Sequence, residues 1–99
     1  MDNQHRKIVG YRELTQADID LMNRIKKAGR NLLELVDEVE GHLDAQYAFF
    51  NESNESPETH AQFDRLAIAE PFKWKELAKT DIQKGTMSLV RAVAQPTDC

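Results

Sequence analysis

The sequence predicts an all-α fold, in which an N-terminal arm is followed by an antiparallel helical hairpin that forms an oligomer. Three observations predict it. Apolar residues recur at alternating spacings of three and four in two long stretches. A polar stretch that ends in a proline separates them. With 99 residues, the chain has room for one domain, residues 1–99, whose own core is small, so we expect burial against further copies.

The first predicted element is a basic arm over residues 1–14, which ends at a helix start signal. Thr15 suits the N-cap position and Asp18 follows three residues later, as in a capping box. The apolar spacing then predicts one helix over residues 16–49, about 50 Å long at 1.5 Å per residue. Its expected apolar seam consists of Met22, Ile25, Gly29, Leu32, Val36, Val39, Leu43, Tyr47 and Phe50.

Residues 50–57 are predicted as a turn, and a second helical segment is predicted over residues 58–94. Ser56 and Pro57 suit the N-cap and the first helical position of that segment. Pro71 is expected to kink it, because proline lacks a backbone N–H and clashes with the preceding turn. Its expected seam consists of Trp74, Leu77, Ala78, Ile82, Gly85, Leu89 and Val93.

The charge is unevenly distributed along the chain, whose net charge is -4 at pH 7. Residues 1–30 carry seven Lys and Arg against four carboxylates, residues 31–70 carry ten carboxylates against Arg65 alone, and residues 71–99 carry five Lys and Arg against three carboxylates. The negative total argues against a protein that wraps duplex DNA. A cationic end could attract a small anion, although a solvated helical surface also explains the pattern.

No catalytic, metal or cofactor site is predicted. The three histidines, His5, His42 and His60, are scattered, and Cys99 is the only cysteine, which excludes an intramolecular disulfide. No apolar run reaches the length of a membrane span and the N-terminus lacks a secretory h-region, so we expect a cytoplasmic protein with no membrane contact.

The N-terminal third holds the candidate ligand residues. Tyr11 lies in the arm, outside the seam, where it could stack on a purine base or pack the arm onto the first helix. Lys26 lies beside the seam on a face that also carries Asn23 and Arg30, either to bind an anion or as a surface lysine. Gly29 makes the helix less stable than alanine would at the same position. Its presence therefore indicates that another backbone or a ligand comes close there.

A second candidate lies near the C-terminus. From Gly85 to Ala94 the segment is apolar or small on nearly every face except at Arg91. Such a helix is normally buried, so Arg91 is expected to pair with an acid, such as Asp81 or Glu70 of a neighbouring helix, or to hold a phosphate.

The distance between the two main candidates favours a site between subunits. Lys26 lies about 16 Å along the helix from Thr15, so Tyr11 of the same chain reaches it only if the arm doubles back. A partner chain packed antiparallel along the first helix would bring its own Tyr11 closer to Lys26.

Two stretches of the chain resemble a known protein family. The stretches HRKIVGYRELTQADIDLMNRIKKAG and TDIQKGTMSLVRAVAQPTD, within residues 5–30 and 72–98, resemble the phage anti-CBASS sponge family. Members of this family are small helical hairpins that sequester the cyclic oligonucleotide messengers of CBASS, a bacterial antiphage defence. Residues 34–70 resemble nothing specific.

The resemblance implies a hexamer that binds cyclic dinucleotides, such as cyclic GMP-AMP, without hydrolysis in the cytoplasm of the infected bacterial host. It implies that Tyr11 and Lys26 are the main ligand contacts. It also implies separate pockets for cyclic trinucleotides, for which Lys73, Arg91 and Thr97 are the candidates.

Two other readings of the sequence stay open. One is a structural or regulatory coiled-coil protein, in which the seam serves only oligomerisation and no nucleotide binds. The other is a transcription regulator, which the net charge and the lack of a short turn between recognition-type helices disfavour. The kink expected at Glu70, Pro71 and Phe72 departs from the resemblance and leaves the preferred cyclic nucleotide open.

Overall fold

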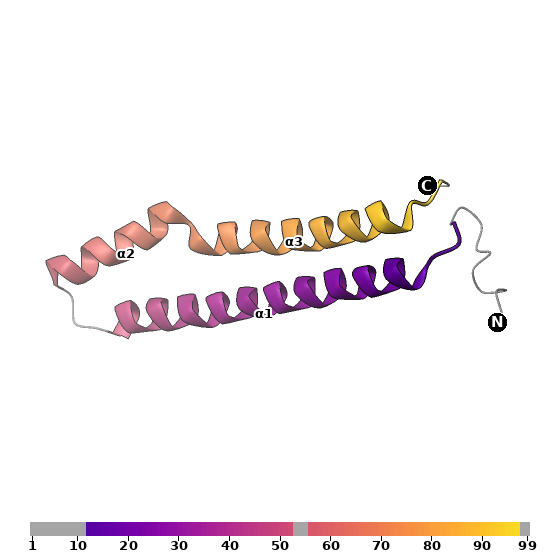
Figure 1. Ribbon diagram of the computed structural model, residues 1–99. Coiled ribbons are helices and arrows are strands. Elements are labelled where there is room, and N and C mark those ends of the chain that lie inside the picture. Colours follow the sequence, from indigo (N-terminus) through magenta and orange to yellow (C-terminus); the bar gives the residue numbers. More distant parts are fainter. Residues whose placement is uncertain (1–11, 53–55, 98–99) are drawn as a thin grey trace. The chain divides into compact units, whose positions relative to one another are not determined.

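A computed structural model describes residues 12–52 and 56–97, and it is helical almost throughout. The helices are α1 (Gln16–Glu52), α2 (Pro57–Ala69) and α3 (Pro71–Ala94), shown in Figure 1. No strand occurs in the described part of the chain, which confirms the all-α prediction. Helix α1 continues past residue 49, the expected end, because neither glycine nor proline interrupts the sequence between Gly41 and Pro57. None of the described helices is long and apolar enough to cross a membrane.

The start of α1 is fixed by the predicted capping box. The backbone N–H of Asp18 donates to the Thr15 hydroxyl (3.1 Å), and the backbone N–H of Thr15 donates to the Asp18 carboxylate (2.9 Å). These bonds satisfy two donors that the first turn of a helix leaves free. The hydrogen bonds from Arg12 and from the Thr15 backbone hold the pKa of Asp18 at about 2, below its ordinary value of 3.8.

Helices α2 and α3 end in the same way. Glu70 and Gln95 have left-handed backbones (φ 50° and 54°), and each donates its N–H to the carbonyl four residues earlier. Each residue precedes a proline, Pro71 or Pro96, which disfavours helical geometry at the position before it. The kink expected near Pro71 is therefore present as a break between two helices.

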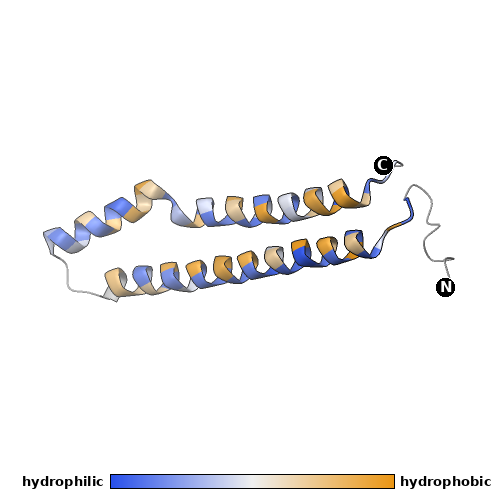
Figure 2. Ribbon diagram, viewed as in Figure 1, coloured by the Kyte–Doolittle hydropathy of each residue, from blue (hydrophilic) through white to orange (hydrophobic). Residues whose placement is uncertain are grey.

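The described residues fall into two compact units, which we call the terminal unit (residues 12–32 and 82–97) and the middle unit (residues 33–52 and 56–81). In the terminal unit, the beginning of α1 lies antiparallel to the end of α3 (Figure 1). Gly29 is buried there against Thr86, so close that an added Cβ would lie 2.5 Å from the Thr86 hydroxyl. Figure 2 shows that the hydrophobic residues of α1 gather on the side turned toward α3.

The middle unit is built around Leu66 of α2, which is only 2% exposed. The Tyr47 ring packs edge-on against Phe63 at 6.0 Å between centroids, and at 5.3 Å against Phe72. Such aromatic pairs add about 0.5–1.5 kcal/mol beyond the area they bury. The ring cluster therefore joins one residue from each of the three helices.

An ion cluster around the buried Lys75 also lies in the middle unit, and its two carboxylate partners are exposed. The side chain of Lys75 is 6% exposed and donates to Glu40 of α1 (2.6 Å) and to its neighbour Glu76. These bonds, with the one to Glu40 first, raise the pKa of Lys75, and the bond from Lys75 lowers the pKa of Glu76. Lys75 is thus charged and paired where the two helices meet.

Many apolar side chains of the described residues remain exposed in the single chain. Leu32 and Val39, both expected in the inward seam, are 48% and 46% exposed, whereas Val36 and Leu43 are buried. The other large exposed apolar side chains are Ile19, Leu21, Leu35, Phe49, Ile68, Trp74, Leu77, Met87 and Leu89. Exposure on this scale is uncommon for a soluble monomer.

Candidate functional site

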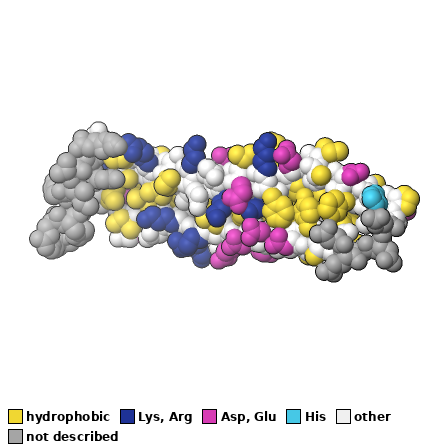
Figure 3. Space-filling view, turned by 180° about the vertical axis from the view of Figure 1, so that it is seen from behind, with side chains coloured by type: hydrophobic (Ala, Val, Ile, Leu, Met, Phe, Trp, Pro, Cys, Tyr) yellow, Lys and Arg dark blue, Asp and Glu magenta, His cyan; other side chains and the backbone are white. Residues whose placement is uncertain are grey.

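The terminal unit concentrates positive charge. Its described residues carry seven Lys and Arg against three carboxylates, whereas those of the middle unit carry four against eleven. Figure 3 shows Lys and Arg side chains spread over the terminal unit and most of the visible Asp and Glu over the middle unit. A small anion is therefore attracted to the terminal unit.

One groove of the terminal unit, which we call the cationic groove, brings three of these cations together. It has a volume of about 690 Å³, within the range of about 300–1,000 Å³ usual for small-molecule sites. Lys26 comes from α1, and Lys84 and Arg91 come from α3. Its other lining residues are Met22, Thr86, Met87, Ser88, Val90, Ala94 and Pro96. None of the described residues that line the groove is a carboxylate, so the charge that they contribute is of one sign.

The polar groups of the cationic groove suit an anionic ligand. Among the described residues, Lys26, Lys84 and Arg91 form no ion pair. The hydroxyls of Thr86 and Ser88 each donate to the carbonyl four residues earlier, at 2.7 and 2.8 Å. Their oxygens are left as acceptors, which can take a hydrogen bond from a base or a ribose, so the three cations alone are the groups that suit phosphate. Three like charges without counter-charge repel one another, and a bound phosphate diester would relieve that repulsion.

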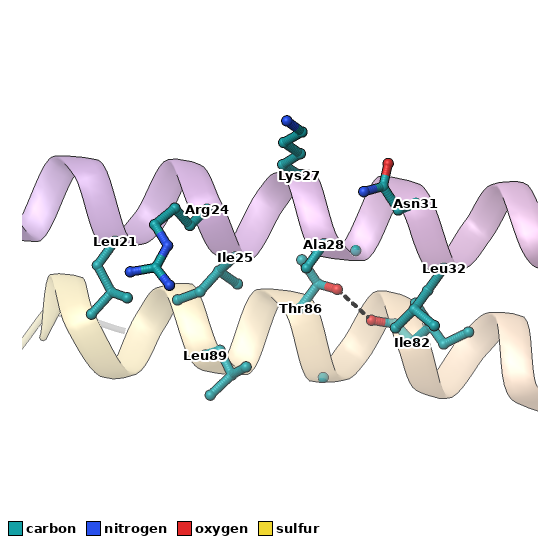
Figure 4. A pocket seen from close by; sticks show the side chains of 12 residues that line it. Leu21, Arg24, Ile25, Lys27, Ala28, Asn31, Leu32, Ile82, Thr86 and Leu89 are labelled. Atoms are coloured by element: carbon teal, nitrogen blue, oxygen red, sulfur yellow. Dashed lines mark hydrogen bonds between the residues drawn. The ribbon is translucent and has the colours of Figure 1, made fainter.

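A second groove, which we call the apolar groove, is lined by the same two helices and shares only Thr86 with the lining of the cationic groove. It is shown in Figure 4, where Lys27 and Asn31 project away from α3 while Leu21, Ile25 and Leu89 lie along the opening. The rest of its lining is Arg24, Ala28, Gly29, Leu32, Ile82, Gly85 and Thr86. Thr86 thus takes part in both grooves, with its hydroxyl bonded back to Ile82.

The structure separates the residues predicted for the cyclic dinucleotide. Lys26 lies in the cationic groove and Gly29 in the apolar groove, where Thr86 of the same chain takes the space that the glycine leaves. Asn23 and Arg30 are exposed on α1 and line neither groove. Tyr11 lies outside the described residues.

The residues predicted for a second nucleotide pocket are separated as well. Arg91 lines the cationic groove together with Lys26, and Thr97 is exposed in the same unit. Lys73 belongs to the middle unit, where it lies 3.9 Å from Glu70 and 5.7 Å from the centre of the Trp74 ring. The predicted pairing of Arg91 with Asp81 or Glu70 is not among the ion pairs of the described residues.

Lys84, the third cation of the groove, was not predicted from the sequence. A periodic signal for it exists, since Lys84, Ser88 and Arg91 follow one another at spacings of four and three and therefore share one helix face. The pairing of that face with Lys26 is a tertiary contact, which no spacing within α3 reveals.

The cationic groove offers groups that can bind a ligand. No group of three or more His, Cys, Asp or Glu that could hold a metal ion occurs among residues 12–52 and 56–97. The groove offers positive charge, two hydroxyl oxygens and the apolar side chains of Met22, Met87 and Val90. This combination matches a ligand with phosphates and flat apolar surfaces.

Known proteins are similar to this chain over most or all of its length. Residues 4–94 match the family described as Acb2/Tad1, hairpin domain. Over an alignment of 108 positions the chain is 50% identical to "Anti-CBASS protein 2" of Pseudomonas phage JBD67, and the alignment covers all of both chains.

Proposed function

The chain belongs to the Acb2/Tad1 hairpin-domain family, and from this we propose that it counters CBASS immunity by binding cyclic dinucleotides and holding them intact. The name of its relative from Pseudomonas phage JBD67, with which it shares half of its aligned residues, supports the anti-CBASS part of the proposal. The observation that carries the ligand part is the cationic groove, where three cations converge and no carboxylate lies among the lining residues.

The phosphates of the ligand are the groups that the groove serves. A cyclic dinucleotide carries two phosphodiester charges, and Lys26, Lys84 and Arg91 together more than balance them. Charge-assisted hydrogen bonds of this kind contribute about 1.5–3 kcal/mol each. Tyr11 would supply stacking on a base, which adds about 1–3 kcal/mol.

Self-association is the second part of the proposal. Leu21, Leu32 and Leu89, which line the apolar groove, are 42%, 48% and 57% exposed in the single chain. A second copy that lays its own apolar side chains on this groove would bury them, and the resemblance implies a hexamer. The lining of the cationic groove shares only Thr86 with the apolar groove, so we expect it to stay open to ligand in such an assembly.

A partner chain packed antiparallel along α1 would bring its own Tyr11 closer to Lys26. This can be tested by mixing two inactive variants, Tyr11→Ala and Lys26→Ala. If each site takes its tyrosine and lysine from different chains, the mixture regains some of the sites. A mixture that regains none would show that each chain builds its own site.

The infected bacterium is the place where the proposed activity is needed, because cyclic oligonucleotides act inside that cell. A binder protects by stoichiometry, so its affinity has to be high, and nanomolar binding corresponds to about -12 kcal/mol. We assign no catalytic residue, and a cyclic trinucleotide site near Arg91 and Thr97 is a further part of this proposal.

The second candidate function is a structural or regulatory coiled-coil protein without a nucleotide ligand. The observation in its favour is the run of exposed apolar side chains on α1, at Leu32, Leu35 and Val39, whose spacings of three and four suit helix pairing. On this reading the cations of the terminal unit are solvated side chains that keep the protein in solution.

One experiment separates the two functions. The protein is incubated with cyclic GMP-AMP, freed of unbound nucleotide, denatured by heat, and the released material is separated by chromatography. Intact cyclic GMP-AMP in stoichiometric amount supports capture without chemistry. Linear products would show an enzyme, and no released nucleotide would favour the coiled-coil reading.

A further inference from the structure

Ser88 lies between two cations of the cationic groove on one face of α3. Lys84 precedes it by four residues and Arg91 follows it by three, and these spacings place the three side chains on the same face. All three line the groove. At 1.5 Å per residue, Ser88 lies about 6 Å along the helix axis from Lys84 and about 4.5 Å from Arg91. Ser88 is therefore a neutral polar group set between two positive charges.

The hydroxyl of Ser88 is committed as a donor and open as an acceptor. It donates its proton to the carbonyl of Lys84 (2.8 Å). A hydroxyl carries one proton, so only lone pairs of the oxygen are left for a ligand. Among residues 12–52 and 56–97, no other group forms a hydrogen bond with Ser88, and the residue is exposed. A phosphate diester has no proton to donate, so this oxygen requires a different part of the ligand.

The order of groups in a cyclic dinucleotide indicates which part that is. Phosphates and riboses alternate around its ring, so each ribose lies between the two phosphates. Each ribose keeps one hydroxyl that is not esterified and can donate a hydrogen bond. If Lys84 and Arg91 each hold a phosphate, the group between them, opposite Ser88, is a ribose. The bases branch off the ring, where the apolar side chains of Met22 and Met87 suit their flat faces.

Thr86 carries the other acceptor oxygen of the groove, in different surroundings. Its hydroxyl donates to the carbonyl of Ile82 at 2.7 Å (Figure 4). The side chain packs against α1, because a Cβ added at Gly29 would lie 2.5 Å from the Thr86 hydroxyl oxygen. Thr86 is half-buried in this contact, whereas Ser88 is exposed. Ser88 is therefore the acceptor that a ligand reaches more readily.

We propose that Ser88 is a specificity-determining residue, which accepts a hydrogen bond from the free hydroxyl of a ligand ribose and so favours ribose over sugars without that hydroxyl. This inference rests on the proposed function, because it needs the cyclic dinucleotide to bind in the cationic groove. A bound ligand displaces water from the Ser88 oxygen. A ligand that lacks the sugar hydroxyl then leaves this oxygen without a partner and binds more weakly.

The test is calorimetric titration with two ligands. One is cyclic GMP-AMP with two 3′–5′ linkages, and the other is the same molecule with fluorine in place of both 2′-hydroxyls. Fluorine keeps the ribose pucker but cannot donate a hydrogen bond. We expect wild type to bind the fluorinated ligand about threefold to tenfold more weakly, the loss of one hydrogen bond. Ser88→Ala should bind the two ligands with nearly equal affinity. An unchanged preference in Ser88→Ala would overturn the proposal.

Two further variants separate the ribose contact from other effects of the substitution. Ser88→Thr keeps a hydroxyl that can donate to the same carbonyl, so it should keep the preference for ribose. Thr80→Ala removes a hydroxyl from an exposed position of α3 outside the groove and should leave both affinities unchanged. Loss of the preference in Ser88→Thr or in Thr80→Ala would show that the hydroxyl of Ser88 is not its source. Alanine favours an exposed helical position, so we expect Ser88→Ala to fold.

Lys26→Ala distinguishes a failure of this inference from a failure of the proposed function. If wild type binds neither ligand, or if Lys26→Ala binds cyclic GMP-AMP as wild type does, the proposed function fails and this inference with it. If Lys26→Ala weakens binding while wild type binds both ligands equally, the cationic groove remains the nucleotide site and only the ribose contact of Ser88 is refuted.

Discussion

Gly29 of α1 and Thr86 of α3 approach each other so closely that no side chain fits at residue 29. An added Cβ would lie 2.5 Å from the Thr86 hydroxyl and 2.9 Å from its methyl group, and 3.2 Å from its Cβ. Rotation of the threonine side chain exchanges one of these contacts for another. The glycine therefore sets how near the two helices of the terminal unit come.

The first prediction concerns this contact. Gly29→Ala should lower the free energy of unfolding by about 1–2 kcal/mol, because the cost of overpacking exceeds the gain of about 1 kcal/mol in helix propensity. In a Thr86→Ala background the same change should become neutral or stabilising. Urea unfolding of all variants at the same protein concentration measures the change in the free energy of unfolding in both backgrounds.

Gly41→Ala is the matched control for that prediction. Gly41 lies on the same helix and an added Cβ meets nothing within 4 Å, so this change should stabilise by about 1 kcal/mol. A stabilising Gly29→Ala in the otherwise unchanged protein would show that the helices are farther apart than described.

A second prediction concerns pH and the contact of Arg12 with Asp18. The pKa of Asp18 in the folded chain is about 2, below its ordinary value of 3.8. A lowered pKa means that the contact contributes its full stability above about pH 4 and loses it as the pH falls toward 2. Wild type should therefore be more stable than Asp18→Asn at about pH 6, with the difference shrinking below pH 4. A difference that stays constant down to pH 2 would contradict the contact.

A third prediction concerns the buried charge of Lys75. Lys75→Met should lower the free energy of unfolding by less than about 1 kcal/mol, or should raise it. Burying methionine does not require removing water from a charge, and its side chain can pack beside Phe72. Glu40→Ala should be the more harmful change, since it removes the first partner of a lysine that stays buried. The reverse order in a denaturant titration would show that the ion pair itself stabilises the unit.

A fourth prediction concerns Glu70, the residue with a left-handed backbone between α2 and α3. Glu70→Gly should stabilise by about 0.5–1 kcal/mol, because a residue with a side chain pays a steric cost at a φ of 50° that glycine does not. The exposed contact with Lys73 that it loses contributes little. Ala67→Gly, three residues earlier and inside α2, should destabilise by about 1 kcal/mol. Thermal unfolding of the two variants should move in opposite directions.

The sequence predicted the features of the fold that local chemistry determines. The capping box of Thr15 and Asp18, the Ser56 cap before Pro57 and the break at Pro71 each depend on residues within one turn of each other. Such signals need no knowledge of the rest of the chain.

Which side of each helix faces inward was harder to predict from the sequence than where each helix begins and ends. Leu32, Leu33, Leu35 and Val36 are all apolar, so the periodicity allows more than one inward face. The structure buries Val36 and leaves Leu32 and Leu35 about half exposed. Which face turns inward depends on how α1 and α3 pair, and a one-chain pattern does not contain that information.

The candidate site, too, could be predicted from the sequence only in part. Lys26 was found because it lies beside the seam and in a block that resembles a known family, and Arg91 because it is a charge in an apolar segment. Their meeting in one groove, with Lys84 as the third cation, follows from the register of α1 against α3. That register places Thr86 at Gly29, a contact between residues 57 positions apart.

The most direct test of the central claim uses the neighbouring lysines Lys26 and Lys27. Lys26 lines the cationic groove, whereas Lys27 lines the apolar groove and projects away from α3 (Figure 4). Each is replaced by alanine, and cyclic GMP-AMP is titrated into both variants and wild type. We predict that Lys26→Ala weakens binding by about tenfold to a hundredfold, the loss of one charge-assisted hydrogen bond, while Lys27→Ala binds as wild type does. Equal affinity of the two variants would contradict the assignment of the cationic groove as the nucleotide site.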